Sequence, residues 1–253
     1  MFALIIITSL LSTNLYAEEV IELPKILRGV KHNGLYYLSY QAGQESNEGY
    51  NYNKFLIKRA YFTLKKEVNS FITSRITLDA HQDDTGDMKV RLKYAYADIK
   101  FPDFIFITMP HVEFGLVHTP WLDFEEHVNY YRMQDTMFME RVGLFNSSDF
   151  GFTFLGYLGG EMAEEYQKSV NNKYPGRCGS FALGAYNGGG YHTKENNQNK
   201  VFQERITVRP LPNIIPGLQF SELFIAGKGN GSGTLDDIND WQTLAGMVSY
   251  EYQ

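Results

Sequence analysis

Arginine and lysine occupy polar positions in several segments in which polar and apolar residues alternate. In residues 89–99, for example, Arg91 and Lys93 alternate with the series Val90, Leu92, Tyr94 and Tyr96. An extended strand places such alternating residues on opposite faces, so the cations share one polar face. If the apolar face meets lipid, the polar face lines an aqueous passage, where guanidinium groups lower the barrier to anions and bind their oxygens in pairs. The predicted lining residues are Arg59, Lys65, Arg75, Arg91, Lys93, Arg205 and Arg209.

Two carboxylates bear on that prediction. Asp79 and Glu113 fall on the same proposed face as the cations and would neutralise part of their charge. The formal net charge of the chain is also negative, at −6. A preference for anions and a nearly neutral lining therefore both remain open at this point.

Residues 119–148 are too long for an ordinary hairpin loop and too rich in aromatic residues and methionine for a disordered one. A segment of this kind that folds into a barrel would narrow its interior. An amphipathic helix lying on the rim is the alternative. The predicted constriction residues are Trp121, Asp123, Glu125, Glu126, Arg132 and Glu140.

Other chemistries have little support in the sequence. Glu125, Glu126 and His127 are adjacent, so they do not share a helix face and are not expected to bind a metal together. His111 and His118 lie seven residues apart, which predicts opposite faces of one strand. The single cysteine, Cys178, allows no internal disulfide, and the sequence has no Gly-x-Ser-x-Gly motif. We therefore predict no catalytic residue, no metal site, no cofactor and no enzymatic activity; a barrel lipase or protease is the rival interpretation.

The elements that must position these residues are β-strands. Many of the candidates have about ten residues, the length with which a tilted strand crosses a bilayer. Short connections alternate with long polar ones, except that residues 159–177 fall where a short turn is expected and predict a short helix. The ten predicted strands are Gly34–Gln41, Lys54–Lys65, Ser70–His81, Lys89–Lys100, His111–His118, Asp149–Leu158, Cys178–Asn187, Lys200–Arg209, Leu218–Gly227 and Trp241–Tyr252.

Composition agrees with such strands. The 253 residues include 18 Tyr and 18 Phe, about twice the usual share, although the mean hydropathy is −0.31. The acidic balance argues against a nucleic-acid partner. Residues 1–17 carry no charge and end in Leu15-Tyr16-Ala17, which predicts a secretory signal peptide; a buried N-terminal strand is the alternative.

Several ordered segments resemble one known family. FLIKRAYFTLKKEVNSFITSRITLDA (residues 55–80), VRLKYAYADIKFP (90–102) and VEFGLVHTPWLDFEE (112–126) look like the phosphate-selective porin O and P family. DTMFMERVGLFNSSDFG (135–151), GAYNGGGY (184–191) and RITVRPLP (205–212) extend the resemblance over most of the chain.

The resemblance implies a sixteen-stranded, usually trimeric barrel in the bacterial outer membrane. It also implies an inward third loop and an arginine ladder, for which Arg59, Arg75 and Arg91 are the closest candidates. The long turn at residues 159–177 departs from the family pattern, and about ten strands are present of the sixteen expected. We therefore expect the sequence to be incomplete at its C-terminus.

The resulting expectation is an all-β fold. Residues 18–253 are predicted to form an antiparallel transmembrane β-barrel, with 119–148 as its inward constriction loop. The predicted function is an outer-membrane porin for passive diffusion of small hydrophilic solutes, with phosphate-like anions as a possible preference. Expected partners are outer-membrane lipid, these solutes and two further copies in a homotrimer. The alternatives are a non-conducting outer-membrane barrel and a secreted β-rich binding protein.

Overall fold

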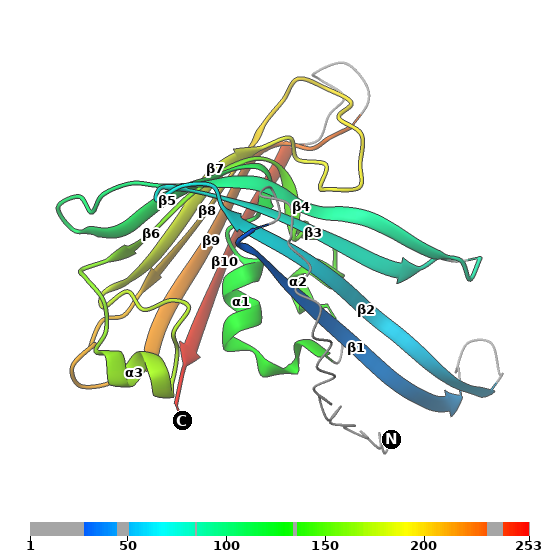
Figure 1. The fold of residues 1–253 in the computed structure, drawn as a ribbon, viewed down its shortest axis with the longest axis horizontal. Coiled ribbons are helices and arrows are strands. Elements are labelled where there is room, and N and C mark those ends of the chain that lie inside the picture. Colours follow the sequence, from blue (N-terminus) through cyan, green and yellow to red (C-terminus); the bar gives the residue numbers. More distant parts are fainter. Residues whose placement is uncertain (1–27, 45–50, 84, 134–135, 232–239, 253) are drawn as a thin grey trace.

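Ten strands dominate the computed structural model, which describes residues 28–44, 51–83, 85–133, 136–231 and 240–252 (Figure 1). Each predicted strand is present, with bounds that differ by a few residues. The strands are β1 Val30–Gln44, β2 Asn51–Glu67, β3 Ile72–Gln82, β4 Met88–Lys100, β5 Ile107–His118, β6 Ser148–Leu158, β7 Gly179–Tyr186, β8 Val201–Val208, β9 Leu218–Lys228 and β10 Asp240–Tyr250. The predicted signal peptide at residues 1–17 lies outside the described residues.

All ten strands belong to one antiparallel sheet, in the order of the sequence from β1 to β10. Each strand pairs with the one before it and the one after it, as in a chain of hairpins. Among the described residues no ladder joins β1 to β10, which form the two edges. The predicted all-β class and the ten antiparallel strands are confirmed.

The two faces of the sheet differ sharply in chemistry. Along β8, Gln203, Arg205 and Thr207 are buried, whereas Phe202 on the opposite face is 38% exposed. The same alternation runs through β10, where Leu244 is 78% exposed. Polar residues therefore gather on the covered concave face, and aromatic and aliphatic residues on the convex face.

A β-bulge at Lys93 changes the faces that the sequence predicts for β4. Thr77 of β3 pairs with Tyr94, but the next residue, Leu78, pairs with Leu92, so Lys93 is the extra residue. Strict alternation places Tyr94 and Tyr96 with the apolar residues, and this placement is wrong. Beyond the bulge both rings turn to the concave face, where Tyr94 is buried.

The connections after odd-numbered strands lie at one end of the sheet, and those after even-numbered strands at the other. The β5–β6 connection contains α1 (Leu122–Val128), a 3₁₀ turn at Tyr130–Met133 and α2 (Phe138–Arg141), and it lies on the concave side (Figure 1). The β6–β7 connection at the opposite end contains α3 (Glu164–Ser169), the short helix predicted there.

An apolar cluster fixes the β5–β6 connection against one wall of the sheet. Its buried members are Trp121, Leu122, Met137, Phe145, Val201, Leu223 and Ile225. The last three come from β8 and β9, so the inner wall becomes apolar where this segment docks. No helix within the described ranges is long and apolar enough to cross a membrane.

Candidate functional site

The concave face of β2–β4 carries a basic wall built around one carboxylate. Asp79 is fully buried, and its Oδ2 accepts a hydrogen bond of 3.0 Å from Nε of Arg91. Arg59 Nη1 lies 3.9 Å from the same oxygen. Lys93, on the bulge, donates to the hydroxyl of Tyr61 at 3.0 Å. Three of the predicted lining cations therefore lie together on this wall, and Asp79 offsets one of their charges.

Arg75 belongs to a second polar network, nearer the β2–β3 turn. Its guanidinium donates to the Tyr96 hydroxyl at 3.3 Å and contacts Nε2 of His118 at 3.2 Å. Because arginine only donates, Nε2 of His118 accepts and its Nδ1 carries the proton, which is donated to Glu113 at 3.0 Å. Glu113 therefore interacts with Arg75 through His118.

Arg205 and Arg209 are less accessible than the sequence suggests. Each is 1% exposed. Arg205 donates to the backbone oxygen of Pro120 at 3.0 Å, and Arg209 donates to the backbone oxygen of Gly176 at 2.7 Å. The two side chains are therefore covered by the connections that carry these carbonyls, whereas Lys65 is exposed on the same face.

The β5–β6 connection presents its acidic residues in several directions. Nε1 of Trp121 donates to Glu125 at 3.0 Å, and burial raises the pKa of the Glu125 carboxyl although this bond opposes the shift. Glu126 forms an ion pair with Arg132. His127 contacts Asn171 instead, so the three consecutive residues 125–127 have three different partners.

Opposite charges face each other between this connection and the basic wall. Arg59 is attracted to Glu140 of the connection as well as to Asp79, and it is repelled by Arg132. Glu126 and Glu140 likewise act on Lys93. The connection packs its apolar side on β8 and β9 and so directs acidic side chains toward β2–β4.

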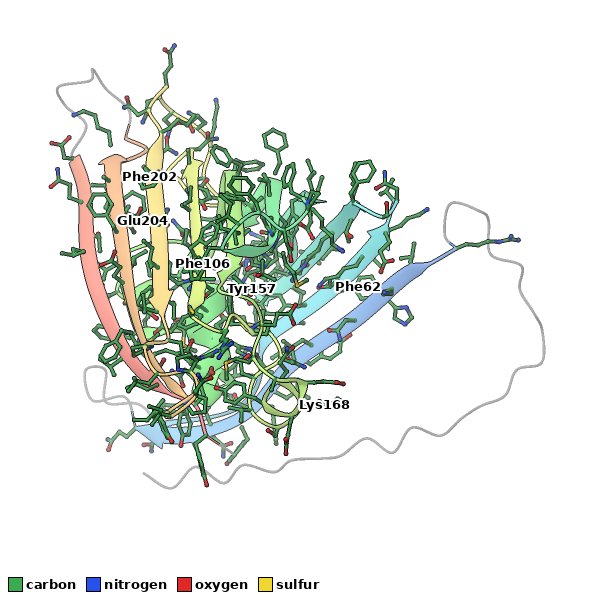
Figure 2. All side chains as sticks on the ribbon, turned by 90° about the vertical axis from the view of Figure 1, so that its left-hand side faces the viewer. Phe62, Phe106, Tyr157, Lys168, Phe202 and Glu204 are labelled. Atoms are coloured by element: carbon green, nitrogen blue, oxygen red, sulfur yellow. The ribbon has the colours of Figure 1, made fainter. Side chains whose placement is uncertain are left out.

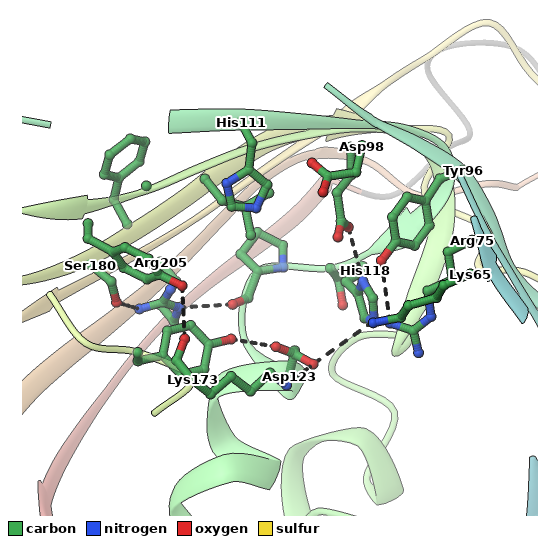
Figure 3. A pocket seen from close by; sticks show the side chains of 18 residues that line it. Lys65, Arg75, Tyr96, Asp98, His111, His118, Asp123, Lys173, Ser180 and Arg205 are labelled. Carbon is green, nitrogen blue, oxygen red and sulfur yellow. Dashed lines mark hydrogen bonds and ion pairs between the residues drawn. The ribbon is translucent and has the colours of Figure 1, made fainter. Parts of the chain in front are cut away.

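A cavity of about 430 Å³ lies between the start of α1 and the concave face of the sheet, next to the β6–β7 connection (Figure 3). Its cationic lining residues are Lys65, Arg75, Lys173 and Arg205, and its acidic ones are Asp98, Glu113 and Asp123. His111 and His118 both line it as well, so the prediction that they lie apart on opposite faces is wrong. The register with β6 is continuous from His111 to His118, and between them Gly115 has a φ of +132°, outside the usual range of a strand.

Sequence reasoning missed the contribution of the β6–β7 connection. Lys173 and Tyr174 both contact Asp123, at 2.6 and 2.5 Å, although they lie about fifty residues away in sequence. The only sequence signal was the unusual length of the connection. No group of three or more His, Cys, Asp or Glu residues that could hold a metal ion occurs in the described part of the chain.

Comparison with known proteins yields no assignment for this arrangement. No family model matches the chain, and no curated protein is significantly similar to it in sequence.

Proposed function

We propose that this chain forms the wall of a β-barrel in the bacterial outer membrane and lets small hydrophilic solutes diffuse through its polar interior. The observation that carries the proposal is the distribution of polarity. All ten strands belong to one sheet whose polar face is concave and whose convex face exposes large apolar side chains. A water-soluble sheet would bury its apolar face, whereas a barrel in lipid exposes it.

The edges of the sheet also support a closed barrel. β1 and β10 pair on one side only among the described residues, and unpaired backbone groups are costly in lipid. Pairing of these edges with further strands would satisfy them. The proposal therefore includes closure of the barrel, and it keeps the sixteen strands and the homotrimer that the family resemblance implies.

The basic wall supports a preference for anions, including phosphate-like ones. Arg59, Arg91 and Lys93 carry three positive charges against one negative charge on Asp79. An anion that passes close to this wall is stabilised, and a cation is repelled. The acidic residues of the β5–β6 connection, which face this wall, weaken the preference for anions. They do not cancel the positive charge of the wall.

A planar lipid bilayer tests the channel directly. Addition of the full-length protein is expected to produce stepwise increases in current. The absence of such steps would refute the channel proposal. In a salt gradient, Arg91→Glu is expected to shift the reversal potential toward cation selectivity. Lys168→Glu makes the same change of charge on exposed α3 and serves as the control.

A second candidate is a barrel that conducts nothing. The burial of Arg205 and Arg209 beneath the two connections favours it, because these connections fill part of the concave side. The two candidates differ in the bilayer experiment, where a filled barrel inserts without current. Membrane insertion without conductance would therefore favour this second function. A secreted binding protein would neither insert into the membrane nor conduct.

A further inference from the structure

The β6–β7 connection meets α1 although the two leave the sheet at opposite ends. α1 follows β5, and the other connection follows β6, so antiparallel pairing separates their points of origin by the length of the strands. Residues 159–178 nevertheless reach far enough to contact α1 directly. We call these residues the β6–β7 brace.

Asp123 of α1 is the central contact. The Lys173 ammonium donates to its Oδ1 at 2.6 Å, and the Tyr174 hydroxyl donates to its Oδ2 at 2.5 Å (Figure 3). Burial alone would raise the pKa of the Asp123 carboxyl, but the charge of Lys173 and these hydrogen bonds hold it below its usual range. The carboxylate is therefore charged, and residues of the brace donate a hydrogen bond to each of its two oxygens.

Asn171 makes a second contact and shapes the tip of the brace. Its Oδ1 accepts from Nε2 of His127 at 2.7 Å and from the backbone N–H groups of Lys173 and Tyr174. Its amide nitrogen donates to Glu251, directly after β10, at 2.6 Å. One buried side chain thus joins α1, the brace and the end of the last strand.

Ring packing completes the contact. Tyr174 is 7% exposed, and its ring meets that of Phe124 edge to face at a centroid distance of 5.0 Å. The guanidinium of Arg205 lies over both rings, 4.5 Å from Phe124 and 5.3 Å from Tyr174. The joint is therefore buried, aromatic and hydrogen-bonded at the same place, which favours a single geometry.

We propose that the β6–β7 brace positions α1 inside the barrel, with Asp123 as the joint and Asn171, Lys173 and Tyr174 as its positioning residues. This inference rests on the proposed function in one respect, namely that α1 narrows a passage. Lys173 also neutralises Asp123, which leaves Lys65, Arg75 and Arg205 facing Asp98 and Glu113 in the cavity. The unusual length of the connection is explained by the distance that it spans.

Hydrogen exchange in the full-length protein, refolded in detergent micelles, tests the brace. Tyr174→Phe removes one hydroxyl and keeps the ring, and Lys173→Met removes the ammonium. Each is expected to speed amide exchange in residues 122–128 about tenfold, the effect of losing a hydrogen bond to a charged group. Lys168→Met, on the exposed face of α3, is the matched control and is expected to change nothing there (Figure 2).

An amide exchange rate in residues 122–128 that stays within twofold of the wild-type rate in both variants would overturn the proposed role of the brace. If Lys173→Met fails to fold, as judged by the β-sheet circular dichroism signal, Tyr174→Phe decides alone. Single-channel current is the second readout, because a released α1 is expected to alter conductance in both variants and a merely structural contact would not. Amide exchange is measured without any ionic current. A failure of the brace proposal can therefore be distinguished from a failure of the channel proposal.

Discussion

Replacement of Asp79 by asparagine tests the basic wall most directly. Asparagine keeps the size of the side chain, removes the charge and replaces one acceptor oxygen by an amide donor. In the folded protein the Asp79 carboxylate lies 3.0 Å from Arg91 and 3.9 Å from Arg59, and it is fully buried. The change leaves two guanidinium groups and the nearby Lys93 without their shared counter-charge.

The size of the effect follows from the exposure of the partners. Loss of one member of a buried ion pair costs about 3–5 kcal/mol. Arg91 and Arg59 retain 31% and 20% of their side-chain exposure, so water compensates part of the loss. We therefore expect Asp79→Asn to lower the free energy of unfolding by about 1–3 kcal/mol. Asp79→Asn combined with Arg91→Gln should cost less than the sum of the two single changes.

Urea unfolding of the protein in micelles measures this cost, with Glu67→Gln as control. Glu67 loses the same charge but pairs with Lys31 on the exposed surface, so we expect no measurable change there. In bilayers Asp79→Asn should also raise the anion-to-cation permeability ratio. One unit charge about 7 Å from a passing ion in water contributes about 0.6 kcal/mol, with opposite sign for an anion and a cation, so the ratio should rise by roughly eightfold at low salt. Equal stability of Asp79→Asn and wild type would refute the proposed role of this carboxylate.

Two further predictions concern the convex face and pH. Leu244→Arg puts a charge on the proposed lipid face and should impair insertion into vesicles by about 2–4 kcal/mol near the midplane. Leu244→Phe keeps the same position apolar and should insert normally; a vesicle-flotation assay with equal yields for both would contradict this. The lowered pKa of Asp123 means that its contribution is complete above its unfolded value of about 3.9 and declines as the pH falls below it. Exchange in residues 122–128 should therefore accelerate below about pH 4 in wild type and much less in Asp123→Asn, and equal pH profiles would argue against a charged joint.

The strands and their polar face are predictable because each depends on local alternation. Arg59, Arg75, Arg91 and Arg205 are placed on one face by a period of two, and the sheet has them there. The prediction fails for Tyr94 and Tyr96 because a single extra residue, Lys93, reverses the alternation. The local pattern does not predict this bulge, because Lys93 continues the alternating polar series of the residues before it.

The contacts of the inserted segments are not local and were not predicted. The period of two predicts that apolar residues such as Leu223 and Ile225 face lipid. In the structure both residues face inward and pack in one cluster with Trp121. The contact between Asp123 and Tyr174 joins two loops, and loop geometry depends on what the loop meets. The prediction that residues 119–148 fold inward agrees with their place on the concave side, but only the structure supplies the partner.

The brace also has a consequence for the order of assembly. The hydrogen bond from Asn171 to Glu251 joins residues 80 positions apart, and Asp123 joins Tyr174 across 51. Closure of such long loops costs entropy before the contacts form, so they are expected to form after the hairpins. α1 is therefore expected to reach its final position only after the end of β10 has joined the sheet.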